Sequence, residues 1–150
     1  MIQRKQTLFL LFAVILGIVT LSMPIASVTA EGLRTAEVYN LFWRDQVGNA
    51  HYSVWPLFVI LLIASAFALY TIFIYKRRMV QVAYCLVSIL LYVAWYIVLI
   101  VYSKSLAPDA LNFHLSFASA LPAVSAILCL MARKGIMADE RLVRAADRIR

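Results

Sequence analysis

The feature that most constrains this chain is the placement of its charged residues. Four stretches contain no Asp, Glu, Lys or Arg, and they cover residues 6–30, 46–75, 79–103 and 110–132. Each is longer than the ~20 residues with which a helix crosses a hydrocarbon core of about 30 Å. Only 14% of the 150 residues are charged, whereas a soluble domain carries about 25%, spread along the chain. The sequence therefore excludes a water-soluble globule and predicts a polytopic membrane protein.

The predicted fold class is an all-α membrane protein, because in lipid every backbone N–H and C=O must be satisfied within the chain. Trimming the polar flanks gives spans at about 7–29, 54–75, 80–102 and 113–131. The second and third spans are separated by a few residues only, so they form an antiparallel hairpin. We expect one domain over residues 1–150, a four-transmembrane-helix antiparallel bundle with a short cytoplasmic amphipathic C-terminal helix.

The distribution of Lys and Arg predicts the orientation, since cytoplasmic loops carry an excess of both. The N-terminus, residues 76–78 and residues 133–150 hold 11 of the 14, and Arg34, Arg44 and Lys104 are the other three. This places both termini in the cytoplasm, with an external loop at 31–53 and a cytoplasmic tail at 133–150. Because no aromatic residues for base stacking accompany the basic ones, we expect no nucleic-acid partner.

Two segments allow alternatives. The external loop contains Leu41, Phe42 and Trp43 amid charges, which favours a segment lying on the membrane surface; a hairpin turning at Gly48 and Asn49 is the alternative. The N-terminus, with its basic start, apolar run and small residues before position 31, resembles a secretory signal peptide. Its apolar run is long for one, so we expect the first helix to be retained; cleavage after residue 30 would leave three spans.

Three segments carry a family resemblance. They are MIQRKQT at residues 1–7, IFIYKRRMVQ at 72–81 and DERLVRAADRIR at 139–150. Together with the length and the four spans, they resemble the bacterial integral-membrane family catalogued as domain of unknown function 4293. The resemblance implies a multi-pass protein of the bacterial inner membrane and supports retention of the first helix. It carries no activity and no catalytic residue.

The residues that could hold a metal or perform catalysis are far apart in the predicted bundle. Cys85 and Cys129 lie near the cytoplasmic helix ends, whereas His51 and His114 lie near the external ends, ~20 Å or more away at 1.5 Å per residue. A structural zinc needs four ligands about 2.0–2.3 Å from one point. The span interiors also lack the ionisable groups of general acid–base catalysis. We therefore expect no metal, no cofactor and no enzyme activity.

The third span has a regular polar pattern. Its members follow alternating spacings of four and three residues: Gln81, Cys85, Ser88, Tyr92, Trp95, Leu99 and Tyr102. Such spacing predicts a seam of left-handed helix packing. Ser88, Tyr92 and Trp95, with His114 on the fourth span, are candidate contacts, either in a hydrogen-bonded bundle seam or around bound lipid. We expect Ser119, Ser125 or the Ala118 carbonyl to be the partners of Tyr92 and Trp95.

Small residues four apart indicate where helices approach closely. The first span has Ala13 with Gly17, and the second has Ala64 with Ala68.

The C-terminal tail has the pattern of an amphipathic helix, with apolar residues inside an arc of ~100° and arginines beside them. Such a helix can lie on anionic lipid or bind a partner. The candidate contacts are Arg141, Leu142, Arg144, Arg148 and Ile149.

The expected function is a non-enzymatic small integral membrane protein, a scaffold or accessory component that binds membrane lipid and a partner complex. The protein would associate with further copies of itself in a homo-oligomer, or with other proteins in a larger membrane complex. One alternative is a homo-oligomeric small-molecule or lipid transporter, with a water-filled cavity reaching Tyr92 or His114. Another is a membrane enzyme that acts on lipid through His51 or His114.

Overall fold

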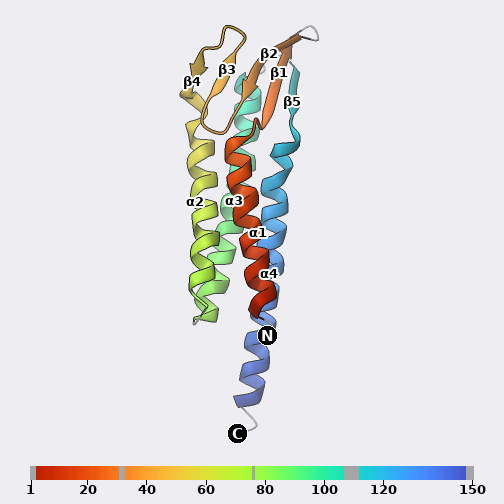
Figure 1. Cartoon of the computed structure of the whole chain (residues 1–150). Coiled ribbons are helices and arrows are strands. Elements are labelled where there is room, and N and C mark those ends of the chain that lie inside the picture. The colour runs from red at the N-terminus through yellow and green to blue at the C-terminus, as the bar shows by residue number, and fades with distance from the viewer. Residues whose placement is uncertain (1–2, 31–32, 76, 107–111, 148–150) are drawn as a thin grey trace.

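Four long helices stand side by side, and a small β-sheet covers one end of them (Figure 1). The computed structural model describes residues 3–30, 33–75, 77–106 and 112–147. The helices are α1 (Gln3–Ser22), α2 (Trp55–Phe73), α3 (Arg78–Leu106) and α4 (Leu121–Asp147), and short 3-10 turns η1 (Tyr52–Val54) and η2 (Phe117–Ala120) precede α2 and α4. Both α1 and α3 pack against α2 and α4, which closes the four helices into a bundle.

The sheet has five antiparallel strands in the order β4-β3-β2-β1-β5. They are β1 (Ala26–Ala30), β2 (Leu33–Val38), β3 (Trp43–Asp45), β4 (Ala50–His51) and β5 (Asn112–Leu115). The strand β1 follows α1 directly, yet it pairs on one side with β5 from far along the chain. We call this end of the molecule the sheet end, and the opposite end, where α1 begins and α2 turns into α3, the basic end.

The strand register places apolar residues on one face of the sheet. Val28 lies opposite Phe113, and Val38 opposite both Ala26 and Trp43. These residues share one core with the last turns of α3. Since side chains alternate along a strand, the outer face carries polar residues in register with one another: Ser27, Glu37, Arg44 and His114.

Asn40 joins the sheet to the bundle. It lies in the connection from β2 to β3, and its side chain is fully buried. Its Nδ2 donates to the carbonyl oxygen of Thr20 at 2.7 Å, and its Oδ1 accepts from Nε1 of Trp95 at 3.0 Å. One amide therefore ties the last turn of α1 and the middle of α3 to the sheet.

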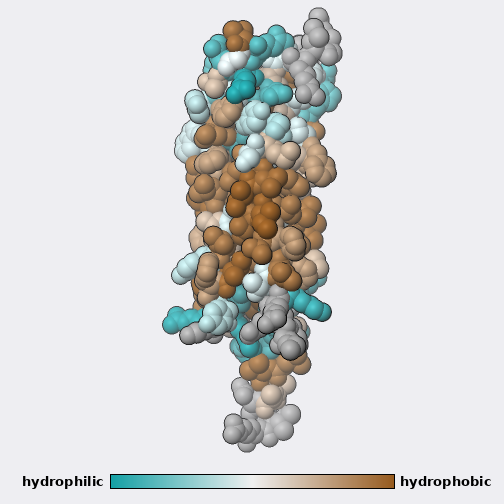
Figure 2. Space-filling view, viewed as in Figure 1, coloured by the Kyte–Doolittle hydropathy of each residue, from teal (hydrophilic) through white to brown (hydrophobic). Residues whose placement is uncertain are grey.

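A belt of exposed apolar side chains surrounds the bundle between polar ends (Figure 2). All four helices are long and apolar enough to cross a membrane. On α2 the belt is bordered by two exposed aromatic residues, Trp55 and Phe73. They are separated by roughly 27 Å along the helix at a rise of ~1.5 Å per residue, which is close to the thickness of a hydrocarbon core.

The sheet corrects the predicted first and last spans. The first was expected at 7–29, but α1 ends at Ser22, and strand β1 begins at Ala26, just after Pro24. The last was expected at 113–131, but β5 occupies Asn112–Leu115 and α4 begins only at Leu121. The absence of charge does not distinguish a strand buried in a sheet from a lipid-crossing helix, and Pro24 disfavours helical backbone in the residue before it.

The described residues of the expected external loop at 31–53 are not irregular but supply β2, β3 and β4. The alternative hairpin is confirmed. The N–H of Asp45 donates to the carbonyl oxygen of Asn49 at 3.1 Å, and that of Gly48 to the carbonyl oxygen of Asp45 at 2.9 Å. Gly48 has a φ of 89°, a left-handed conformation that costs glycine little.

The described part of the C-terminal tail is helical, as predicted, but it is not a separate helix, since α4 runs unbroken to Asp147. Gly135 does not interrupt it. A Cβ at this position would lie 3.0 Å from Cγ of Gln6, so the missing side chain leaves room for α1 to pack there. The last turns of α4 therefore project beyond the bundle along its own axis (Figure 1).

Candidate functional site

The predicted seam on α3 lies inside the bundle. Its buried residues are Gln81, Cys85, Ser88, Tyr92, Trp95 and Leu99, and Tyr102 is half-buried, with its hydroxyl donating to the Ser53 carbonyl oxygen at 3.0 Å. The amide of Gln81 donates to the Thr71 carbonyl oxygen at 3.1 Å, which joins α3 to α2. The seam is thus a packing surface, and its residues Gln81 and Tyr102 bond to backbone carbonyl oxygens.

The α4 serines are not the hydrogen-bond partners that we expected for Trp95. Its indole N–H donates to Asn40 instead. The contact with α4 is made by Tyr96, whose hydroxyl donates to the Ser119 carbonyl oxygen at 2.6 Å and accepts from the Ala123 N–H at 3.0 Å. Tyr96 thereby satisfies backbone groups at the start of α4, where N–H groups have no partner within the helix.

Tyr92 lies where all four helices meet. Its side chain has no exposed surface, and among the described residues its hydroxyl has no hydrogen-bond partner within the usual limits. The nearby hydroxyls of Ser65 and Ser125 donate to carbonyl oxygens at 2.9–3.2 Å, on their own helices and, for Ser125, also at Ala13 of α1. Small hydroxyl residues therefore fill the middle of the bundle around this ring.

His114 is not at the start of the fourth helix, as predicted, but in the edge strand β5, where it is exposed. His51 belongs to β4, the opposite edge of the sheet, and its ring stacks on Trp43 at 4.5 Å. The two histidines therefore share no site. Within the described residues, no three His, Cys, Asp or Glu side chains come together as metal ligands would.

The predicted tail contacts lie on the projecting part of α4. Arg141, Leu142 and Arg144 are exposed, and Nε of Arg144 lies 3.0 Å from Oε1 of Glu140. Arg148 and Ile149 lie outside the described residues.

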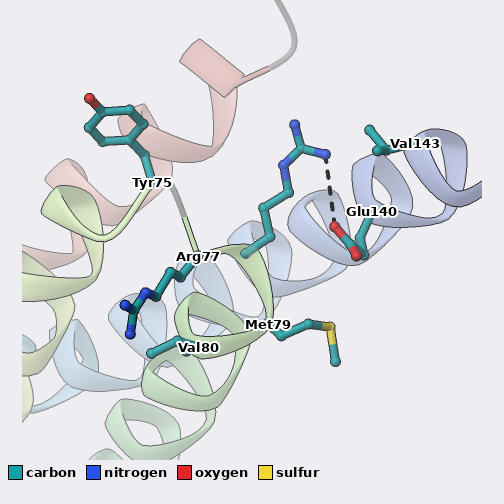
Figure 3. Close-up of a pocket in the computed structure, with 7 residues that line it drawn as sticks. Tyr75, Arg77, Met79, Val80, Glu140 and Val143 are labelled. Atoms are coloured by element: carbon teal, nitrogen blue, oxygen red, sulfur yellow. Dashed lines mark ion pairs between the residues drawn. The ribbon is translucent and has the colours of Figure 1, made fainter. Parts of the chain in front are cut away.

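At the basic end, a groove separates the α2–α3 turn from α4 (Figure 3). It has a volume of about 630 Å³ and is lined by Tyr75, Arg77, Arg78, Met79, Val80, Glu140 and Val143. One guanidinium nitrogen of Arg78 lies 3.9 Å from a Glu140 oxygen across it. The sequence singled out the basic turn between the second and third spans and the C-terminal tail. It did not predict that these two segments line one groove.

The neighbouring residue of α4 faces the other way. Asp139 accepts a hydrogen bond from Nε2 of Gln6 at 2.6 Å, which holds α4 to α1. Asp139 thus fixes α4 to α1 at the last level of the bundle, and Glu140 makes a longer contact with Arg78 of α3. Every residue from Arg141 to Ala146 is exposed. The basic end therefore has two accessible features, the groove and the free end of α4.

Comparison with known proteins agrees with the family resemblance. The family model described as Domain of unknown function (DUF4293) matches residues 2–149, so the chain belongs to this family. No curated protein matches the chain.

Proposed function

We propose that this member of the DUF4293 family is a non-enzymatic scaffold or accessory protein of the bacterial inner membrane. In this proposal the apolar belt crosses the bilayer, and the basic end faces the cytoplasm. The free end of α4 binds a partner protein, and the bundle surface contacts lipid. Most Lys and Arg residues belong to the basic end and the tail, which supports this orientation.

The observation that carries the proposal is the free end of α4. After Glu140 the helix leaves the bundle, and it presents Leu142, 62% exposed, and Val143, 42% exposed. Hydrophobic surface extends along this part in Figure 2, beyond the polar zone at the end of the bundle. In the proposed orientation it would stand in water rather than in lipid, and exposed apolar surface in water indicates an interaction site.

Site-specific photocrosslinking in living cells tests the partner. A photoreactive residue at Val143 is expected to give adducts with a partner protein. The same residue at Ile97, exposed on the apolar belt of α3, should give lipid adducts. Leu142→Glu should remove the adducts at position 143, because a carboxylate interrupts the apolar contact. Equal protein labelling at 97 and 143, or labelling that survives Leu142→Glu, would contradict the proposal; adducts between copies of the chain alone would favour a homo-oligomer.

We also propose that the first helix is retained. Cleavage after Ala30 would remove α1 together with β1, the strand that joins β2 to β5. It would also remove Ile25, whose backbone bonds Val38 and Ser116. The protein purified from membranes should therefore have an intact mass near 16.9 kDa. A species that begins at residue 31 would show that the segment is a signal peptide.

A further inference from the structure

We propose that the groove at the basic end binds the phosphate-bearing headgroup of an anionic phospholipid. The inference deepens the proposed function, because it relies on this end lying at the cytoplasmic membrane surface. It names the lipid class and the residues that would bind it, Arg77 and Arg78 from the α2–α3 turn.

The carboxylate of Glu140 in the groove lies closer to Arg144 than to Arg78. Glu140 is 3.0 Å from Arg144 but 3.9 Å from Arg78. Charge-assisted N–H···O bonds are typically about 2.7–2.9 Å long, so the second contact is loose. A guanidinium has five N–H donors, and Arg78 therefore keeps donors for another anion. Arg77 also lines the groove and is exposed; its guanidinium is directed away from Glu140 (Figure 3), so it adds a second positive charge at the rim of the groove.

Arg133 of α4 is not among the residues that line the groove but lies on its membrane side. It precedes Glu140 by seven residues, which is two turns, so both lie on the same face of α4 about 10 Å apart. Its Nε atom is buried and has no hydrogen-bond partner among the residues that the structure describes. Arg133 therefore adds positive charge on the membrane side of the groove, and its Nε is not assigned as a contact of the bound phosphate.

The groove also has an apolar side, which distinguishes a lipid from a free phosphate ion. Met79 and Val80 line it on α3, and Val143 lines it on α4 (Figure 3). Met79 is 58% exposed, and the apolar belt of α3 begins at this residue. A phospholipid places its phosphate beside the arginines and its glycerol and acyl carbons along Met79 and Val80, on the membrane side of the groove, whereas a free phosphate would gain nothing from these two side chains.

The test measures lipid retention by the purified chain. The protein is equilibrated in detergent with equal amounts of phosphatidylglycerol and phosphatidylcholine, and native mass spectrometry counts the lipids that remain bound. The wild type should retain phosphatidylglycerol preferentially. Arg77→Gln/Arg78→Gln should reduce that preference by about fivefold for each arginine. Arg44→Gln/Lys104→Gln, which removes the same charge at the sheet end, should leave it unchanged.

Thermal unfolding of the wild type gives a second readout that does not depend on the variants folding. Phosphatidylglycerol should raise the unfolding midpoint and phosphatidylcholine should not, since a ligand that binds only the folded state stabilises it. An absent preference in the wild type, or an equal preference in the groove variant, would overturn the inference. Displacement of the lipid by millimolar inorganic phosphate would also overturn it and assign the groove to a soluble ligand.

The lipid assay contains no partner protein and leaves Leu142 and Val143 intact. If the crosslinks at position 143 are absent but the lipid preference is present, the proposed partner protein is contradicted and the inferred lipid site is supported. If the crosslinks form but the lipid preference is absent, the inferred lipid site is contradicted and the proposed partner protein is supported.

Discussion

Replacement of Asn40 with alanine should lower the free energy of unfolding by about 2–6 kcal/mol. The side chain is fully buried and donates to the Thr20 carbonyl oxygen while it accepts from the Trp95 indole. The substitution leaves a buried N–H and a buried C=O without these partners, and each such group costs about 1–3 kcal/mol. The loss should be felt in the bundle as well as the sheet, because Thr20 belongs to α1 and Trp95 to α3.

Thermal unfolding in detergent, followed by circular dichroism, checks this expectation. Asn49→Ala is the matched control, since Asn49 is exposed in the β3–β4 hairpin and should change the midpoint little. A double-mutant cycle with Trp95→Phe isolates the shared hydrogen bond: once the indole N–H is gone, Asn40→Ala should cost less than it does in the wild type. Additive effects of the two substitutions would show that the bond contributes nothing measurable.

The helices could be predicted from the sequence because their signals are local. The absence of charge over residues 54–75 and 80–102 nearly coincides with α2 and α3. The alternation of four and three residues on α3 likewise identified the buried face, from Gln81 to Leu99. Both signals arise within one helix, where every side chain's position follows from a fixed rise and turn.

The sheet could not be predicted in this way, because its pairing is not local. The strand β5 pairs with β1 from the other end of the chain, and no short-range pattern in Asn112–Leu115 indicates this partner. The buried role of Asn40 could not be predicted for the same reason, since its partners are distant in the sequence. An Asn between elements is ordinarily a turn residue, and only the docking of the sheet on the bundle brings its amide to Trp95.

The contact between α3 and α4 shows that a correctly predicted buried face does not identify which of its neighbouring residues makes the hydrogen bond. The seam pointed to Tyr92 and Trp95 as the residues that would bond to Ser119, Ser125 or the Ala118 carbonyl, but Tyr96 makes the bond to the Ser119 carbonyl oxygen. The prediction placed the start of the fourth helix at residue 113, whereas α4 begins at Leu121. A shift of the helix start changes which level of α3 its first turn meets.

The second large effect is expected at Gly17, where α1 and α2 pack closely. A Cβ built on Gly17 would overlap the Ser65 hydroxyl and lie 3.3 Å from Ser65 Cβ and 3.7 Å from the Tyr92 hydroxyl. Ser65 already donates to the Leu61 carbonyl oxygen at 2.9 Å, so it cannot turn away without losing that bond. Gly17→Ala should therefore lower the free energy of unfolding by about 1–3 kcal/mol, the usual cost of overfilling a packed core.

Two further variants assign this loss to the helix contact. Gly17→Ala/Ser65→Ala removes the hydroxyl that the new methyl group meets, and it should recover much of the stability lost by Gly17→Ala. Gly135→Ala is the comparison at the α1–α4 contact: there the added carbon comes no closer than 3.0 Å to the Gln6 side chain, so a shift of that side chain by a few tenths of an ångström relieves the contact, and the loss should be smaller than at Gly17. Helix propensity favours alanine over glycine by about 1 kcal/mol at both positions. A higher unfolding midpoint for Gly17→Ala would mean that propensity alone acts there, and that α1 does not approach α2 as closely as the structure has it.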